Sequence, residues 1–270
     1  MDHFQRSGLT FPVRDGGPPG GDVVVLLHGF PQDASSFDEV VPLLHERGLR
    51  TLAPTQRGYV TTARPRRRRD YRTAEVVADV VALIDAAGLA RAHIVGHDWG
   101  GIQGWALAAW HPDRVASFTA LSTPHPAAML GALVTSSQGL RSWYMGFFQL
   151  PATPELVAAR TLRGSLVDAR LPTGYAERYS RAMAEPGALT GALNWYRGIP
   201  FSIRPAVGRV TVSTTYVWGR HDFALGRAAA ARTQSHVLGP YRFVELSAGH
   251  WLPETNPHEV AAAILDRAGH

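Results

Sequence analysis

The sequence predicts an α/β protein, in which a mostly parallel sheet carries helices on both faces and a helical segment is inserted. Continuous apolar runs such as Val23–Leu27 are typical of strands buried on both faces. These runs alternate with segments whose apolar residues recur at helical spacing. The alternation stops near residue 124, where aromatic residues become frequent, and it resumes near residue 212. We therefore expect a core of residues 1–124 and 209–270, with a connecting loop and helical cap over residues 125–208.

Each expected element rests on its own pattern. Strands are expected at short apolar or β-branched runs, at residues 23–27, 50–54, 92–95, 115–121, 212–218 and 241–246. Helices of the core are expected where apolar residues recur every three or four positions, at residues 36–48, 73–88, 102–111 and 257–268. Ser36 is the expected N-cap of the first helix. Segments of the cap expected to be helical are residues 153–163, 174–184 and 188–196. The Gly- and Pro-rich residues 16–21 predict a hairpin turn.

Composition excludes several classes of function. The 270 residues include no cysteine, which excludes disulfides and thiolate metal sites. The 12 histidines show no metal-binding spacing, so no metal and no other cofactor is expected. No apolar segment fits a signal peptide or a bilayer span, so we expect a cytoplasmic protein that does not bind membranes. The oligomeric state stays open, and a homodimer is one option.

The charge of the chain does not indicate a nucleic-acid partner. The net charge is +5, and all the basic residues counted in it are arginines. The densest run, residues 64–69, has no aromatic residues interleaved with its arginines, and no nucleic-acid-binding motif accompanies it. We interpret this run as a solvated loop before a helix.

The stretch Gly96-His97-Asp98-Trp99-Gly100-Gly101 separates an expected strand from an expected helix. A sharp turn with glycines on both sides is typical of a nucleophile elbow, which usually presents a serine. Here Asp98 stands in that position. A carboxylate attacking an acyl carbon makes an anhydride, whereas its attack on a saturated carbon makes an ester that activated water can cleave. Asp98 thus indicates a reaction with an epoxide or an alkyl halide, although the pentapeptide Gly96–Gly100 alone also fits a purely structural turn.

The ends of other expected strands supply an acid and a base. Ligands of open α/β sheets bind beyond the carboxyl ends of the strands, so the residues there are the candidate site. Asp222 follows the strand at 212–218, and His250 follows the strand at 241–246. Nucleophile, acid and base in this chain order are typical of α/β-hydrolases. We therefore expect Asp98, Asp222 and His250 to form a catalytic triad.

The chain resembles the epoxide hydrolases among the α/β-hydrolases, over essentially its whole length. The motifs shared with haloalkane dehalogenases are the Asp98 elbow, His28-Gly29-Phe30-Pro31, Trp218-Gly219-Arg220-His221-Asp222 and Gly249-His250-Trp251. The more specific motifs lie in the cap, and they are Trp143-Tyr144 with residues 147–151, and Leu193-Asn194-Trp195-Tyr196-Arg197. The resemblance implies a cis Phe30–Pro31 bond.

The resemblance implies how an epoxide ring is opened. Asp98 attacks a ring carbon, while the hydroxyl groups of Tyr144 and Tyr196 donate hydrogen bonds to the ring oxygen as negative charge develops there. Tyr196 matches its motif on both sides. Tyr175 or Tyr179, also in the cap, remains an alternative to Tyr144 as its partner.

The second half of the reaction releases the product from the enzyme. Neutral His250 removes a proton from the water that attacks the Asp98 ester. Asp222 fixes the tautomer of the imidazole and stabilises its charged form. The backbone N–H groups of Phe30 and Trp99 are expected to form the oxyanion hole.

The expected partners are a small epoxide and water. Side chains of the cap expected to contact substrate are Trp143, Met145, Phe147, Phe148 and Trp195. Their apolar character indicates an apolar epoxide with aryl or alkyl substituents.

Three other interpretations remain open. A haloalkane dehalogenase would use the same covalent cycle, but Phe30 occupies the position of the asparagine that helps to hold the halide. A fluoroacetate dehalogenase is expected to have arginines beside the nucleophile, where this chain has Trp99 and Ile102. A receptor that reuses the pocket without catalysis is the alternative from another class, because fold does not determine function.

Overall fold

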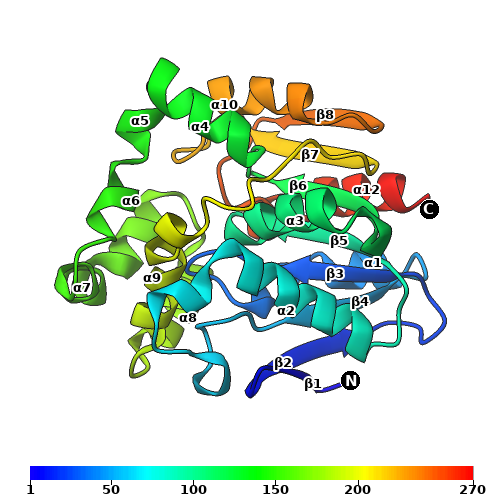
Figure 1. Cartoon of the computed structure of the whole chain (residues 1–270), viewed down its shortest axis with the longest axis horizontal. Coiled ribbons are helices and arrows are strands. Elements are labelled where there is room, and N and C mark those ends of the chain that lie inside the picture. Colours follow the sequence, from blue (N-terminus) through cyan, green and yellow to red (C-terminus); the bar gives the residue numbers. More distant parts are fainter. Residues whose placement is uncertain (270) are drawn as a thin grey trace.

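The computed structural model describes residues 1–269, so His270, the last residue of the predicted core, lies outside the described residues. Within that range eight strands form one sheet in the order β1-β2-β4-β3-β5-β6-β7-β8 (Figure 1). Neighbouring strands from β4 to β8 run parallel, and β1 and β2 add an antiparallel edge. The strands are β1 His3–Arg6, β2 Leu9–Gly16, β3 Val23–Leu27, β4 Arg50–Pro54, β5 Ala92–His97, β6 Val115–Leu121, β7 Thr214–Gly219 and β8 Tyr241–Leu246.

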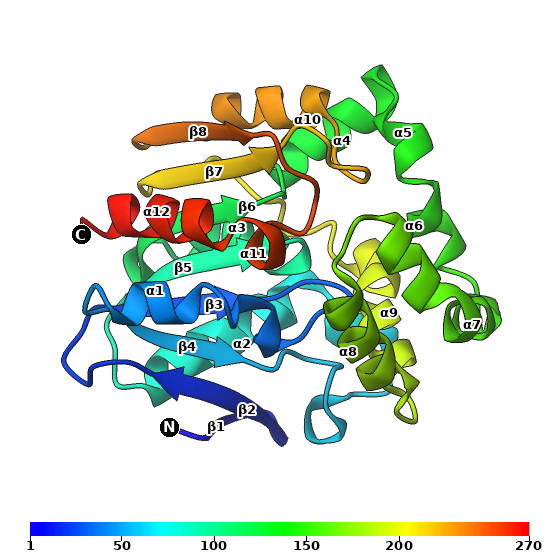
Figure 2. The same cartoon turned by 180° about the vertical axis from the view of Figure 1, so that it is seen from behind.

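Helices cover both faces of the sheet, as the alternating pattern predicts (Figures 1 and 2). The helices outside the β6–β7 connection are α1 Val41–His45, α2 Thr73–Ala86, α3 Trp99–Trp110, α10 Arg227–Arg232, α11 Leu252–Thr255 and α12 Pro257–Ala268. Short 3-10 helices are Ala34–Phe37, Thr61–Ala63, Arg68–Tyr71, Pro112–Arg114, Ile199–Phe201 and Thr233–His236.

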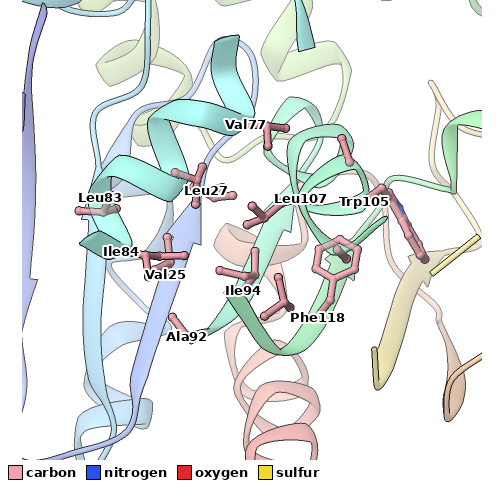
Figure 3. Packing of buried hydrophobic residues seen from close by; sticks show 14 of the residues in the cluster. Val25, Leu27, Val77, Leu83, Ile84, Ala92, Ile94, Trp105, Leu107 and Phe118 are labelled. Atoms are coloured by element: carbon pink, nitrogen blue, oxygen red, sulfur yellow. The ribbon is translucent and has the colours of Figure 1, made fainter. Parts of the chain in front are cut away.

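The central strands are apolar throughout because their side chains enter two separate cores. In β3, Val23, Val25 and Leu27 pack with α2 and α3 on one face, as Figure 3 shows for Val25 and Leu27. Val24 and Leu26 point to the opposite face, where α1 and α12 cover them. Burial on both faces is the normal situation of a parallel sheet with helical crossovers. It fixes the carboxyl ends of β3, β5, β7 and β8 along one edge, where a site can form.

The connection between β6 and β7 is helical, and its helices α6–α9 lie beyond that edge of the sheet (Figures 1 and 2). We call residues 125–208 the insertion, after the range predicted for the connecting loop and cap. Its helices are α4 Pro126–Thr135, α5 Gln138–Arg141, α6 Trp143–Phe147, α7 Thr153–Asp168, α8 Thr173–Ala184 and α9 Ala188–Arg197. The first of them, α4, packs against α10 beside the sheet.

Three details at the N-terminal side differ from the sequence patterns. β1 and β2 were not expected, because an exposed edge strand alternates buried and exposed residues over only a few positions. Residues 16–21 do not form the predicted hairpin, since β4 lies between β2 and β3 in the sheet. Ser36 is not an N-cap, because the carboxylate of Asp33 accepts from the Ser35 N–H at 2.8 Å and starts a 3-10 helix there. No helix within residues 1–269 combines the length and apolar character needed to cross a membrane.

Candidate active site

Asp98 occupies a sharp turn between β5 and α3. Its backbone has φ 51° and ψ −117°, a conformation that residues other than glycine rarely adopt. A Cβ atom on Gly96 would lie 2.2 Å from the Gly100 carbonyl oxygen, and one on Gly100 would lie 2.1 Å from the Leu27 carbonyl oxygen. Only glycine therefore lets α3 approach the strands this closely. The glycines of the motif present the Asp98 carboxylate at the strand edge.

Asp222 and His250 meet Asp98 from neighbouring strand ends. The Nδ1 atom of His250 lies 2.8 Å from Oδ2 of Asp222, and its Nε2 atom lies 3.8 Å from Oδ2 of Asp98. The other oxygen of Asp222 accepts from the N–H groups of Ala224 and Leu225, at 2.8 and 2.9 Å. These contacts fix the Asp222 carboxylate, which therefore holds the proton of a neutral His250 on Nδ1. In this neutral form the Nε2 atom is an acceptor and lies on the side of Asp98.

The charges around His250 change its proton affinity. Burial alone would lower the pKa of His250, but the carboxylates of Asp222 and Asp98 outweigh it and raise the pKa to about 9. The backbone carbonyl oxygen of His250 accepts a hydrogen bond from the Ser122 hydroxyl at 2.7 Å and lies 2.9 Å from Nε2 of His97. Sequence reasoning did not identify Ser122 as a support of the base, because a serine after a strand has many possible uses.

The two oxygens of Asp98 have different surroundings. Oδ1 accepts from the Phe30 N–H at 2.8 Å, and the Trp99 N–H also stabilises the carboxylate. Burial raises the pKa of Asp98, whereas the nearby His250 and these two N–H groups lower it. Phe30 precedes Pro31 through a cis peptide bond, as the resemblance implies. Oδ2 is left on the side of His250, so it is the oxygen available for attack.

Tyr144 and Tyr196 come together next to Asp98. Their ring centroids are 6.0 Å apart, and both side chains line the same cavity as Asp98. Burial raises the pKa of both phenols, and the charge of Asp98 raises it further, so both hydroxyls stay protonated at neutral pH. The Trp99 ring packs edge to face against the Tyr196 ring, with centroids 4.9 Å apart. Neither hydroxyl donates to a protein acceptor among residues 1–269.

The alternatives to Tyr144 point elsewhere. The Tyr175 hydroxyl donates to Glu39 at 3.2 Å, near the surface. The Tyr179 hydroxyl is buried and donates to Glu254 at 2.9 Å. Both hydroxyls are therefore occupied, and neither residue lines the cavity at Asp98.

The cavity above Asp98 has a volume of about 490 Å³ and is mostly apolar. Of the predicted contact residues, Trp143, Phe147 and Phe148 line it. One face of α7, which sequence reasoning did not identify, forms a large part of the wall through Pro154, Val157, Ala158, Thr161, Leu162, Ser165 and Leu166. From other segments, Leu140, Arg141 and Phe223 also line the cavity.

Two predicted contact residues do not line the cavity. Trp195 is buried between the insertion and the core, and its indole N–H donates to the Arg57 carbonyl at 2.7 Å. Met145 packs into the apolar cluster around Tyr196 and does not line the cavity. Each of the two is the sequence neighbour of a tyrosine, and neighbouring side chains of a helix point in different directions. Contact of Met145 and Trp195 with substrate therefore stays a prediction that the cavity lining does not support.

The fold, together with Asp98, Asp222 and His250 after the ends of β5, β7 and β8, is that of the α/β-hydrolase class of enzymes. Residues 22–257 match the family described as alpha/beta hydrolase fold. Epoxide hydrolase A of Mycobacterium tuberculosis is 33% identical over 96% of this chain and 94% of its own length. The AB hydrolase superfamily protein YfhM of Bacillus subtilis is 32% identical, with the same coverage. The crystal structure of epoxide hydrolase A from Mycobacterium thermoresistibile superposes with a TM-score of 0.85 at 28% identity, covering 98% of this chain and 96% of that one. The chain belongs to the epoxide hydrolase family of the α/β-hydrolases.

Proposed function

We propose that this enzyme hydrolyses an apolar epoxide to a vicinal diol through an ester of Asp98. The observation that carries the proposal is the placement of two tyrosine hydroxyls, free of protein acceptors, across one cavity from the Asp98 carboxylate. An epoxide that lies between Asp98 and the two tyrosines has a ring carbon toward the Asp98 carboxylate and its oxygen toward the two hydroxyl groups. The apolar lining from Phe147, Phe148 and the α7 wall favours an apolar substituent on the ring.

The first step opens the ring. Oδ2 of Asp98 forms a bond to a ring carbon as the bond from that carbon to the ring oxygen breaks. The oxygen leaves as an alkoxide that receives hydrogen bonds, and then a proton, from the Tyr144 and Tyr196 pair. The result is a hydroxyalkyl ester of Asp98, with one tyrosine to be reprotonated from solvent.

The second step hydrolyses the ester. Neutral His250 takes a proton from a water molecule at Nε2, and the oxygen of that water attacks the carbonyl carbon of the ester. Negative charge moves to Oδ1, where the Phe30 N–H stabilises it, and the Trp99 N–H also stabilises the Asp98 carboxyl group. The tetrahedral intermediate then releases the diol, and the imidazolium, stabilised by Asp222, returns its proton to the departing alkoxide. Asp98 keeps one oxygen atom of the water.

The surroundings of Trp99 favour an epoxide over an alkyl halide. A halide leaving group needs N–H donors that point into the cavity. The Trp99 indole instead packs edge to face against the Tyr196 ring, and Trp99 does not line the cavity. Phe30 lines the cavity with an apolar ring. Haloalkane dehalogenation therefore has fewer suitable donors here than ring opening has.

A single turnover in oxygen-18 water tests the proposed covalent route. With enzyme in excess over styrene oxide, the first diol is expected to be unlabelled, and the peptide that contains Asp98 is expected to gain the label. Mass spectrometry of the diol and of the peptide reads both outcomes. Label that enters the diol directly in the first turnover would show that water attacks the epoxide without an ester. Absence of turnover would shift the search to haloalkanes.

The pH dependence of ester hydrolysis is expected to differ from that of the free enzyme. In the free enzyme the pKa of His250 is about 9, partly because Asp98 is charged. Esterification removes that charge, so the pKa of His250 falls in the alkyl-enzyme. Because only neutral His250 accepts a proton, the hydrolysis rate should rise with pH and level off with a midpoint below about 9. Single-turnover decay of the preformed ester across a pH series measures this midpoint, and a pH-independent rate would contradict the role of His250.

A further inference from the structure

The carbonyl oxygen of the peptide group between Gly29 and Phe30 is contacted by two side chains. The Tyr59 hydroxyl donates to the Gly29 carbonyl oxygen at 3.0 Å, and Nδ1 of His28 lies 3.1 Å from the same oxygen. The rings of Tyr59 and His28 meet edge to face, with centroids 4.6 Å apart. Two side chains therefore converge on one backbone oxygen, in the loop that follows β3.

The hydrogen bonds of His28 define which of its nitrogens carries the proton. The Gln56 N–H donates to Nε2 of His28 at 3.2 Å, so Nε2 is an acceptor. Burial lowers the pKa of His28 to about 4, and the ring is therefore neutral at neutral pH. Its single proton then lies on Nδ1 and is donated to the Gly29 carbonyl. The carbonyl thus accepts two real hydrogen bonds, one from Tyr59 and one from His28.

The opposite side of the same peptide group carries the Phe30 N–H, which donates to Oδ1 of Asp98 at 2.8 Å. The Gly29–Phe30 bond is trans, so its C=O and N–H point in opposite directions in one rigid plane. Holding the oxygen therefore aims the N–H at Asp98. Hydrogen bonds accepted by the carbonyl also polarise the peptide and strengthen the N–H as a donor.

We infer that Tyr59 is a positioning residue of the oxyanion hole, which acts through the Gly29–Phe30 peptide and does not touch the substrate. The inference rests on the proposed function, because that function places developing charge on Oδ1. The two steps of the reaction differ in this respect. Oδ1 loses negative charge when the ester forms, and it gains a full charge when water attacks the ester. Tyr59 therefore supports hydrolysis of the ester and contributes nothing to its formation.

The variant Tyr59→Phe tests this inference, since it removes one hydroxyl and keeps the ring against His28. Hydrolysis of the ester is expected to slow by about 10-fold, which is less than the ~100- to 1000-fold typical of deleting an oxyanion-hole donor outright. Formation of the ester should stay within about 2-fold of the parent rate. The alkyl-enzyme then accumulates, and kcat and KM fall together while kcat/KM is preserved. Stopped-flow single-turnover kinetics with intact-mass detection of the ester separate the two rates.

Tyr71→Phe is the matched control. The Tyr71 hydroxyl is a donor to a backbone carbonyl as well, that of Pro65 at 2.9 Å, and its ring is buried. It has no contact with the Gly29–Phe30 peptide, so its removal should change neither step. Equal slowing of both steps in Tyr59→Phe, or unchanged hydrolysis, would overturn the inference.

A measurement without substrate separates this inference from the proposed function. In protein labelled with nitrogen-15 at phenylalanine, the amide proton of Phe30 is expected to shift upfield in Tyr59→Phe, because its hydrogen bond to Asp98 weakens. The same signal should be unmoved in Tyr71→Phe. An unmoved Phe30 signal in Tyr59→Phe overturns the inference even if the enzyme hydrolyses epoxides. A shifted signal in an enzyme that forms no Asp98 ester supports the positioning role and contradicts the proposed function alone.

Discussion

Replacing His250 with Gln is expected to leave an enzyme that reacts once with its epoxide and then stops. Attack by Asp98 needs no base, so the ester still forms. Its hydrolysis loses the group that takes the proton from water, a loss worth up to about 10000-fold in rate. The glutamine amide can still donate a hydrogen bond toward Asp222, so the buried carboxylate is not left without a partner. After excess epoxide is added, intact-protein mass should increase by the mass of one substrate molecule.

A peptide map and a control variant make that result specific. Peptide mapping is expected to place the added mass on Asp98 and on no other carboxylate. His221→Gln is the control, because His221 is exposed and precedes Asp222 but does not line the cavity. It should turn over like the parent enzyme. Sustained turnover by His250→Gln would mean that another group activates the water, and the buried His97, whose ring centroid lies 4.9 Å from that of His250, would be the first to test.

The meeting of Asp98, Asp222 and His250 at one edge of the sheet was predictable because each residue follows an expected strand of the parallel sheet. The strand ending before Asp98 is buried at every position but His93, and the strand before Asp222 is buried at every position. Parallel strands align their carboxyl ends, so residues far apart in the sequence are brought together by topology alone. The same logic places Phe30 beside Asp98. Contacts of 2.8 to 3.8 Å among these residues then follow from the local turns, which no sequence pattern describes.

The wall of the cavity was less predictable because it depends on how helices of the insertion rotate. Neighbours of the two tyrosines were expected to share their environment, yet Trp195 turns to the Arg57 carbonyl. Helix α7 contributes Val157, Thr161 and Ser165, which are four residues apart and therefore share one face. That stripe mixes apolar and polar residues, so it carries no signal of the kind that identifies a buried helix face. Its role becomes visible only when the helix is placed above Asp98.

The double variant with Tyr144→Phe and Tyr196→Phe is expected to lose ring opening almost completely. Each hydroxyl is a donor without a protein acceptor beside Asp98, and each stays protonated at neutral pH because its pKa is raised. Removing one preorganised donor costs about 100- to 1000-fold in such sites, so each single variant should be slowed by roughly 100-fold and the double variant by more. The loss should appear in kcat/KM for ester formation, since the alkoxide forms in that step.

Rapid-quench sampling with intact-protein mass spectrometry gives the rate of ester formation directly. Tyr175→Phe is the control, because the Tyr175 hydroxyl is bonded to Glu39 near the surface and its loss should leave that rate unchanged. The pattern also distinguishes the proposed reaction from dehalogenation. A leaving halide takes up no proton and does not need a phenol. If the double variant still forms the ester at the parent rate, the leaving group is therefore stabilised by some group other than the two tyrosines. If the double variant loses ester formation but still hydrolyses ester that has already formed, the two hydroxyls act on the ring oxygen of an epoxide.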